Sequence, residues 1–371
     1  MPQYEDPVDG MAIAAEALRT WTARLLESVG TPADIAADVA EVLVAADRRG
    51  IASHGTARLD QYTALVEAEV VDPAARPLLE RERAALARFD ARNGWGHHAG
   101  RIAVDWAIAA ARTAGSATAV VHNSNHYGIA GWYALRAAGA GLVGLSFTNA
   151  SPLVAPTRAR RPVVGTNPIA LAAPAGRHGT FCLDMATSTV PRGRIEVAAR
   201  RGETLPVGWA IDTEGRPATT PEAALAGALH PLGGGEQTGG YKGYGLSLAV
   251  DLLTGVLAGA RSGSDIASLF NPHSGRSDLG HAFVVIDPSA VDDRGAFEAR
   301  LERLLDQVTS APTSPDAPGR VLFPGEPEHD AEVLADARGV AMDREHHAML
   351  TAIGARRGIP LPRASSLAPR P

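Results

Sequence analysis

The chain has 371 residues, of which 45% are hydrophobic and 20% are charged, an ordinary composition for a globular protein with a sizeable buried core. A net charge of −6 and the lack of a basic cluster interleaved with aromatic residues argue against nucleic acid as a partner. Cys182 is the only cysteine, so no intrachain disulfide can form, and no uncharged apolar run is long enough to span a membrane. Since the N-terminus also lacks the basic-then-apolar pattern of a secretory signal, we expect a cytoplasmic protein.

Residues 1–75 are predicted to form a helical N-terminal segment. In the range 11–29 apolar residues recur at helical spacing, and the run stops at Gly30, a residue type typical of helix ends. Thr31 is then expected to cap a second helix that ends near Gly50. The apolar stripes of both helices indicate a packed core.

Residues 76–325 are predicted to form the core of an α/β (mixed α+β) fold, because helical and strand-like runs alternate there. The expected helices cover residues 98–115, a stretch up to 135 and 243–257, and the expected strands cover 118–121, 142–147, 163–171 and 181–183.

Within this core, the segment 139–144 (GAGLVG) matches the dinucleotide-binding pattern G-x-G-x-x-G. That pattern requires glycines that follow a strand and open a helix, whereas these glycines follow a helix and lead into a strand. We therefore interpret the segment as a helix-to-strand turn, and we expect any nucleotide site to be built in another way.

Residues 326–371 are predicted to return to helix, at about 332–357, and to pack back on the N-terminal segment. The last dozen residues are rich in proline and arginine, a composition that favours disorder.

The segment Ser53–Arg58 (SHGTAR) is a candidate anion-binding corner. If Ser53 caps a helix, His54 and Arg58 lie one turn apart on the same face near its positive end. Arg58 could then hold a carboxylate through two hydrogen bonds, with the imidazole of His54 beside the carbon that carries it. The structural alternative is a capping serine, a packed histidine and a surface arginine.

A second polar cluster, Asn123–Gly128 (NSNHYG), follows a strand, where ligands gather in open α/β sheets, although it could equally be a polar turn. His122 and His126 stand four residues apart, which on a helix is metal-ligand spacing. They lie in a loop with no acidic third ligand nearby in the sequence, so we expect no metal site. The histidine pairs at 97–98 and 346–347 are expected to be solvated.

Lys242 is the only lysine of the chain and lies between glycines, in GGYKGYG. An ammonium is a compact point charge and a guanidinium a wide planar fork, so a lysine kept among arginines hints at a confined site for a phosphate or hydroxyl. The alternative is a lysine that survives by chance on a solvated loop.

A set of segments occurs along the chain in a fixed order. They are RGIASHGTARLDQY (49–62), NSNHYG (123–128), FTNASP (147–152), VGTNPIA (164–170), LDMATS (183–188), PVGWAID (206–212), GGYKGYGLSLAVDLL (239–253), GHAFVVID (280–287) and FPGEPE (323–328). Together, from about residue 11 to about residue 357, they resemble the type-2 malate/L-lactate dehydrogenase family. That family includes ureidoglycolate dehydrogenase, sulfolactate dehydrogenase, diketogulonate reductase and Δ1-piperideine-2-carboxylate reductase.

The resemblance implies a homodimer with a non-Rossmann site for NAD or NADP, and hydride transfer between the nicotinamide and the carbon next to a carboxylate. The residues that resemble catalytic positions are His54, Ser53 and His126, and those that resemble substrate-binding positions are Arg58, Arg48 and Thr166. His54 is the expected proton donor and Arg58 the expected carboxylate clamp, whereas in some members His126 is the acid–base residue instead. The residues that resemble the coenzyme site are His126, Tyr127, Gly128, Ile129, Ala130, Asn149, Asp184, Met185, Ala186, Thr187, Ser188, Tyr241, Lys242, Pro324, Gly325 and Glu326.

Reduction of a small 2-oxo acid to a 2-hydroxy acid needs a hydride on C2 and a proton on the oxygen, which a histidine can give and retake. A cyclic ketimine (piperideine- or pyrroline-2-carboxylate) reductase would use the same corner, with nitrogen in place of oxygen. A metal-dependent hydrolase built on His122 and His126, or a non-catalytic α/β binding protein, is a remoter alternative. The arginine often found before the PGE triplet is absent, since residues 321–323 are Val, Leu and Phe, so the choice between NAD and NADP stays open.

Overall fold

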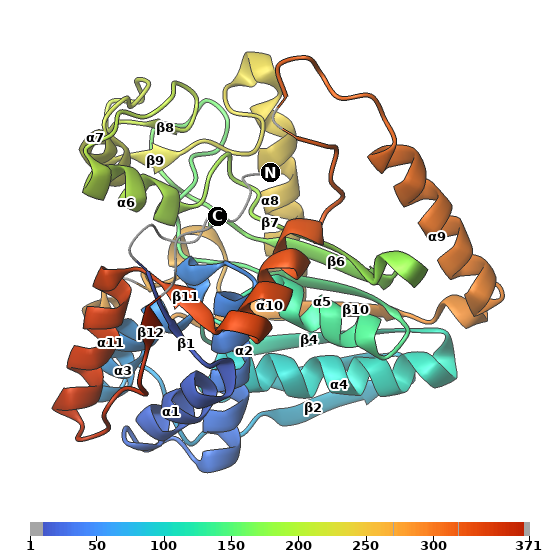
Figure 1. Cartoon of the computed structure of the whole chain (residues 1–371), viewed down its shortest axis with the longest axis horizontal. Helices are drawn as coiled ribbons and strands as arrows, with labels where there is room; N and C mark the ends of the chain where they lie inside the picture. The colour runs from blue at the N-terminus through green and yellow to red at the C-terminus, as the bar shows by residue number, and fades with distance from the viewer. Residues whose placement is uncertain (1–9, 270, 318, 367–371) are drawn as a thin grey trace.

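The computed structural model describes residues 10–269, 271–317 and 319–366, and a seven-stranded sheet lies at its centre (Figure 1). In spatial order its strands are β2 (Leu78–Arg83), β3 (Leu86–Asp90), β4 (Ser116–Ser124), β10 (Leu279–Ile286), β5 (Val143–Thr148), β6 (Ile169–Pro174) and β7 (Thr180–Met185). β3 and β4 pair in parallel, and the other neighbours in this sheet pair antiparallel. The sheet therefore differs from the parallel, doubly wound sheet of a Rossmann domain.

Helical segments cover both faces of this sheet. On one face α4 (Gly96–Ala114) packs against β4 and β10, and α5 (Ala130–Gly139) packs against β5 and β6 (Figure 1). On the other face α8 (Gly240–Asp251) continues into a π-helical segment, Leu252–Leu257, which packs against β10 and β4. Because β10 is covered on both faces, most of its residues are buried, and its sequence LGHAFVVI is accordingly apolar.

The two ends of the chain form a second layer, beside the sheet. It contains α1 (Ala15–Glu27), α2 (Ala33–Arg48), α3 (Leu59–Glu67), α10 (Glu326–Arg338) and α11 (Arg344–Arg356). Strands β11 (Val340–Met342) and β12 (Ser365–Ser366) pair with β1 (Met11–Ile13) from either side. Leu18 of α1 and Leu43 of α2 lie in one fully buried apolar cluster with Leu350 and Ile353 of α11. Burial of this one cluster therefore stabilises both ends of the chain.

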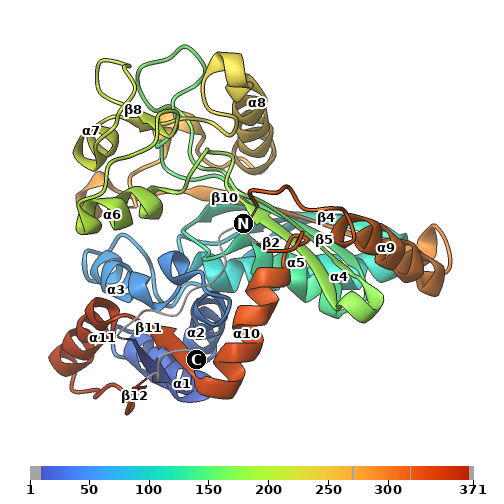
Figure 2. The same cartoon turned by 45° about the horizontal axis from the view of Figure 1, so that its top comes forward.

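A smaller lobe lies above the sheet in Figure 2. It contains α6 (Arg192–Arg201), α7 (Pro221–Ala226), β8 (Ala210–Ile211) and β9 (Ala228–Leu229), and it has an apolar cluster of its own that includes Ile195 and Leu205. The first turn of α6 meets the N-terminal layer, because a Cβ atom built on Gly193 would lie 3.4 Å from Cβ of Ser53. The remaining long helix, α9 (Arg294–Thr309), lies at the periphery, where Leu305 is its buried residue (Figure 1).

The predicted mixed α/β class is confirmed, and so is the interpretation of the segment 139–144. α5 ends at Gly139 and β5 begins at Val143, and between them Gly141 has a φ of 81°, a left-handed conformation that favours glycine. The GAGLVG segment is thus a helix-to-strand turn.

Several predicted boundaries were wrong. The first helix begins at Ala15, after a strand. The second begins at Ala33 with Pro32 at its N-cap position and no side-chain cap, and the hydroxyl of Thr31 accepts a hydrogen bond from Trp95 Nε1 at 3.2 Å. The strand expected at 163–171 begins at Ile169.

The C-terminal segment also differs from its prediction. Gly339, with a φ of 92°, ends α10, and β11 separates this helix from α11, so the helical range expected at about 332–357 is interrupted by a strand. Part of the expected disordered tail forms β12, which pairs with Met11 and Ala12. Residues 367–371 lie outside the described residues.

Candidate active site

The segment Ser53–Arg58 forms two short 3₁₀ turns, Ala52–His54 and Thr56–Arg58, before α3 begins at Leu59. The prediction that Ser53 caps a helix carrying His54 and Arg58 was therefore wrong. Gly55 explains the break between the turns, since a Cβ atom at this position would lie 1.8 Å from Oδ1 of Asp47. The chain turns so tightly over α2 that only glycine fits.

Asp47 of α2 holds this corner in place through hydrogen bonds to Thr56. Its Oδ2 accepts hydrogen bonds from the backbone N–H of Thr56 at 2.9 Å and from the Thr56 hydroxyl at 2.6 Å. Because that hydroxyl has one proton, the contact of 3.0 Å between Thr56 Oγ1 and His346 Nε2 requires the imidazole to donate. His346 of α11 is thus bonded to the corner, which corrects the expectation that it is solvated.

His54 lies in this corner with a half-buried side chain. Its Nδ1 is 2.9 Å from Oγ of Ser53, and Nε of Arg58 donates to the backbone oxygen of Ser53 at 2.6 Å. Burial, and then the positive charge of Arg58, lower the pKa of His54 to about 4. His54 is therefore neutral at physiological pH and can accept a proton.

His126, from the loop after β4, stacks on His54 with ring centroids 5.6 Å apart and an angle of 27° between the rings. Its Nδ1 lies 2.6 Å from the hydroxyl of Tyr62 on α3 and 3.2 Å from the backbone nitrogen of Gly128. Burial, and then the charges of neighbouring groups beginning with His54, lower the pKa of His126 well below its ordinary value. The structure thus brings together the two histidines that the sequence placed in separate motifs.

The expectation that His97 and His98 are solvated was wrong. His97 is fully buried with its ring edge-on to Tyr62, at 5.4 Å between centroids, and its ring nitrogens have no hydrogen-bond partner within the described residues. His98 is also buried, and its Nδ1 lies 2.6 Å from Oδ2 of Asp38. His97 therefore belongs to the wall behind His126, whereas His98 links α4 to α2.

The segments expected to hold a coenzyme meet around Asp184–Ser188. The backbone N–H of Gly131, in the first turn of α5, donates to Oδ2 of Asp184 at 2.7 Å. The backbone N–H groups of Thr187 and Leu232 bond to Thr166 O and Thr187 O respectively, both at 2.8 Å.

Pro324 and Gly325 join the same group of segments, since Cys182 N–H donates to Pro324 O at 3.0 Å. A Cβ atom on Gly325 would lie 2.8 Å from the Cys182 nitrogen, so the loop needs glycine to approach β7. Glu326 pairs with the guanidinium of Arg320, with Nη1 at 3.1 Å. An arginine is therefore present beside the PGE triplet, although not at the position where the sequence pattern places it.

Lys242 lies in the first turn of α8 with an exposed side chain, 5.9 Å from the ring centroid of Tyr241. The neighbouring glycines serve packing, because a Cβ atom on Gly240 would lie 1.9 Å from Gly234 O and one on Gly243 would lie 2.3 Å from Leu232 O. The exposed side chain of Lys242 does not support the interpretation that the lysine lies in a confined site. The first turn of α8 packs against Leu232, which bonds to Thr187 in one of the segments expected to hold a coenzyme.

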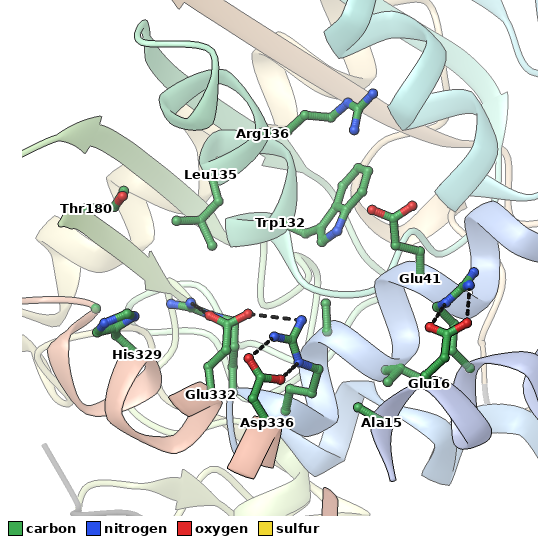
Figure 3. Close-up of a pocket in the computed structure, with 16 residues that line it drawn as sticks. Ala15, Glu16, Glu41, Trp132, Leu135, Arg136, Thr180, His329, Glu332 and Asp336 are labelled. Carbon is green, nitrogen blue, oxygen red and sulfur yellow. Dashed lines mark hydrogen bonds and ion pairs between the residues drawn. The ribbon is translucent and has the colours of Figure 1, made fainter. Parts of the chain in front are cut away.

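Two residues expected at the site have other partners. Arg48 bonds both carboxylate oxygens of Asp336, at 2.9 and 2.7 Å, and lies 3.2 Å from Glu332 on α10. These groups line a separate cavity of about 550 Å³ between α1, α2, α5 and α10, shown in Figure 3. The Asn149 amide donates to Asp251 Oδ1 and Arg261 O and accepts from Gly280 N–H. We therefore infer that Arg48 links α2 to α10, and that the Asn149 side chain stabilises the fold through its hydrogen bonds.

The histidines of the possible metal site are separated. His122 lies 2.9 Å from Glu80 of β2, and these two groups and Asp90 place their ligand atoms within 4.8 Å of one another. Two acidic groups that are distant in the sequence, Glu80 and Asp90, thus lie beside His122 in the fold. His126 instead contacts Tyr62, so the pair does not form the spacing that a two-histidine hydrolase site needs.

Comparison with known proteins decides the family. Residues 13–351 match the family model described as malate/L-lactate dehydrogenase. The chain belongs to the malate/L-lactate dehydrogenase family. The predicted family and the predicted class of enzyme, a dehydrogenase or reductase of hydroxy acids, are thus confirmed.

Individual relatives agree with this assignment. The chain is 41% identical to malate dehydrogenase of Pyrococcus abyssi over 306 residues, which is 82% of this chain and 83% of the relative. It is 34% identical to the Δ1-pyrroline-2-carboxylate/Δ1-piperideine-2-carboxylate reductase of Pseudomonas putida over 313 residues, 84% and 87% of the two chains. The crystal structure of malate dehydrogenase from Entamoeba histolytica superposes with a TM-score of 0.91 at 31% identity, covering 95% of this chain and 100% of the other.

Within the described residues, no helix of this family member is both long and apolar enough to cross a membrane.

Proposed function

We propose that this member of the malate/L-lactate dehydrogenase family catalyses hydride transfer between NAD or NADP and C2 of a small 2-hydroxy or 2-oxo acid. The reaction takes place at the corner formed by His54, Arg58 and His126. The observation that carries this proposal is the stacking of His54 on His126, with the Arg58 charge acting on both rings. The corner thus combines a proton acceptor (His54), a second imidazole (His126) and a cation that can bind a carboxylate (Arg58).

The residues of the corner would divide the chemistry as follows. Arg58 attracts the substrate carboxylate, and His54, neutral and paired with Ser53, accepts the proton of the substrate hydroxyl in the oxidation direction. A bound nicotinamide coenzyme supplies the complementary hydride acceptor or donor. Because a bound carboxylate would offset the charge of Arg58, it would raise the pKa of His54 and help this group to hold the proton.

The coenzyme would be held by the segments that meet around Asp184–Ser188. The first turn of α5 bonds to Asp184, and the loop at Pro324–Glu326 bonds to Cys182 on the same strand. The first turn of α8, which carries Lys242, packs against Leu232, and Leu232 bonds to Thr187. A helix N-terminus and an exposed ammonium both suit a phosphate-bearing coenzyme. Thr166 remains our proposal for a substrate-side group, since its carbonyl accepts a hydrogen bond from Thr187 and so places Thr166 beside the segment proposed to hold the coenzyme.

The substrate is proposed to be a 2-hydroxy acid rather than a cyclic imine, because the malate dehydrogenase relative is 41% identical and the cyclic imino acid reductase 34% identical. A panel of 2-oxo acids and cyclic imino acids should be screened through the absorbance of NADH and, separately, NADPH. We expect turnover with at least one 2-oxo acid. Turnover with cyclic imino acids alone would favour the ketimine reductase, and no turnover with any of them would overturn the proposal.

We also propose a homodimer, and the exposed apolar side chains of α8 and its continuation are the surface that favours it. Tyr241, Leu248, Leu252 and Val256 have exposures of 55%, 43%, 57% and 71% and recur at near-helical spacing. Leu252→Glu should convert the dimer to a monomer in light scattering, whereas Val291→Glu, at a distant exposed valine, should not. A monomeric wild-type protein would contradict this proposal.

A cytoplasmic location remains a proposal that rests on the single, buried cysteine. Cell fractionation with antibody detection would test it.

A further inference from the structure

The hydroxyl of Tyr62 makes a short contact with the active-site ring of His126. Tyr62 is 2% exposed, its ring packs edge-on against Trp95 and His97, and its Oη lies 2.6 Å from His126 Nδ1. Burial raises the pKa of Tyr62, so the hydroxyl keeps its proton at physiological pH. The group is therefore a neutral hydroxyl that can donate or accept one hydrogen bond at this position.

The backbone of Gly128 decides the direction of that bond. Its N–H lies 3.2 Å from the same Nδ1 of His126, and a backbone N–H can only donate. Nδ1 must therefore offer a lone pair, and a proton on Nδ1 would leave the Gly128 donor facing another donor. Since Nδ1 is the acceptor, the Tyr62 hydroxyl donates to it as well, and neutral His126 carries its proton on Nε2.

This tautomer limits what His126 can do. A ring nitrogen that already bears a proton cannot accept a second one from the substrate, and Nδ1 faces Tyr62 and Gly128. The fully buried ring of His97 lies beside it, with centroids 6.5 Å apart, and its nitrogens have no hydrogen-bond partner among the described residues. This neutral ring cannot stabilise an imidazolium as a carboxylate would. His126 is thus suited to donate a hydrogen bond from Nε2 and to keep its proton.

We propose that Tyr62 is a positioning residue that, together with the Gly128 N–H, holds His126 as the neutral Nε2–H tautomer, a hydrogen-bond donor to the heteroatom on C2 of the substrate. The inference rests on the proposed function for its catalytic meaning. His54 then moves the proton, because Ser53 can accept from its Nδ1 and leave Nε2 with a lone pair for the substrate. In the oxidation direction the proton of the substrate hydroxyl would go to His54 and the hydride on C2 to a bound oxidised nicotinamide coenzyme, and His126 would be unchanged at the end of the step.

The tautomer can be measured directly by ¹⁵N NMR of histidine-labelled protein without coenzyme, with His126→Gln used to assign the signals. We expect Nδ1 of His126 to have the shift of an unprotonated ring nitrogen and Nε2 that of a protonated one. In Tyr62→Phe, which keeps the ring and removes the shorter of the two hydrogen bonds, only the longer Gly128 contact favours an unprotonated Nδ1. Part of the His126 population should therefore change tautomer, and the averaged Nδ1 signal should move toward the protonated range. Tyr133→Phe is the matched control, because its equally buried hydroxyl donates to the backbone oxygen of Tyr127 instead.

A protonated Nδ1 in the wild-type protein would overturn the inference, and so would shifts that stay unchanged in Tyr62→Phe. If Tyr62→Phe does not fold, the wild-type spectrum alone decides. Tyr62→Phe should also lower kcat roughly ten-fold with the coenzyme KM unchanged, about what one lost hydrogen bond represents. An unchanged kcat would refute the catalytic role of Tyr62.

The two proposals can fail separately. Hydride turnover together with a protonated Nδ1 would overturn the role of Tyr62 and leave the proposed function standing. The predicted tautomer in a protein that turns over no 2-oxo or 2-imino acid would support the geometry and overturn the proposed function.

Discussion

At the scale of single residues, the sequence led to His54, Arg58 and His126 because these side chains stand in short polar motifs. It did not reveal the polar role of Tyr62, which belongs to the apolar stripe of α3 by its spacing. The contact between Tyr62 and His126 joins α3 to a loop after β4, so no local pattern could predict it. His97 was misjudged for the same reason, since only the tertiary packing shows that it is buried.

The pKa of His54 predicts the pH dependence of the oxidation reaction. The unprotonated ring is the active form of the base, and its pKa of about 4 lies below the ordinary value of 6.5 because of burial and Arg58. kcat/KM should therefore stay constant from about pH 7 to about pH 5, measured in brief assays with enzyme added from neutral stock. A decline already near pH 6 would show that the base has an ordinary histidine pKa.

At the scale of elements, long amphipathic helices and the helix-to-strand turn at 139–144 could be predicted, because their periodicity and glycine order are local. The hairpin of β2 and β3 could not. The β2 sequence LLERER is exposed at every position, so it shows no alternation of buried and exposed residues. The two 3₁₀ turns at the corner depend on the close approach of Gly55 to Asp47, which is again a tertiary contact.

The link from α2 through the corner to α11 predicts the effect of Thr56→Val. The change keeps the shape of the side chain but removes the hydroxyl bonded to Asp47 and His346. A buried acceptor that loses its donor costs about 1–3 kcal/mol, so urea unfolding should show a loss of this size. Thr351→Val, on the exposed face of α11, is the control and should change stability by less than about 0.5 kcal/mol. Equal stability of both variants would contradict the role given to this network.

At the scale of the whole molecule, both chain ends share one core beside the sheet, and the corner lies where this layer meets the lobe of α6. The sequence predicted the class of fold and the return of the C-terminal helices, whereas the domain boundaries at 75 and 325 stay predictions. The order of the strands could not be predicted, because non-adjacent segments pair in the sheet: β10 lies between β4 and β5.

The buried histidines predict that the folded protein loses stability in mild acid. Burial lowers the pKa of both His97 and His281 to about 3, whereas the unfolded chain binds these protons near 6.5. Neither histidine lowers the free energy of unfolding above about pH 6.5, where both are neutral in the folded and the unfolded chain. As the pH falls from about 6.5 toward 3, each histidine lowers the free energy of unfolding by about 1.4 kcal/mol per pH unit. His97→Phe should reduce the slope of unfolding free energy between pH 6 and pH 5 by about that amount, whereas the exposed His273→Phe should not. Equal slopes in both variants would contradict this linkage.

The central claim, that His54 moves the proton while His126 holds the substrate, is tested most directly by comparing turnover in His54→Asn and His126→Ala. His54→Asn should lower kcat by roughly 10²–10⁴-fold with coenzyme binding unchanged, the usual contribution of a general acid or base. His126→Ala, which removes a hydrogen-bond donor, should cost roughly ten-fold. The opposite order, with turnover abolished in His126→Ala and largely kept in His54→Asn, would make His126 the acid–base residue and contradict the account.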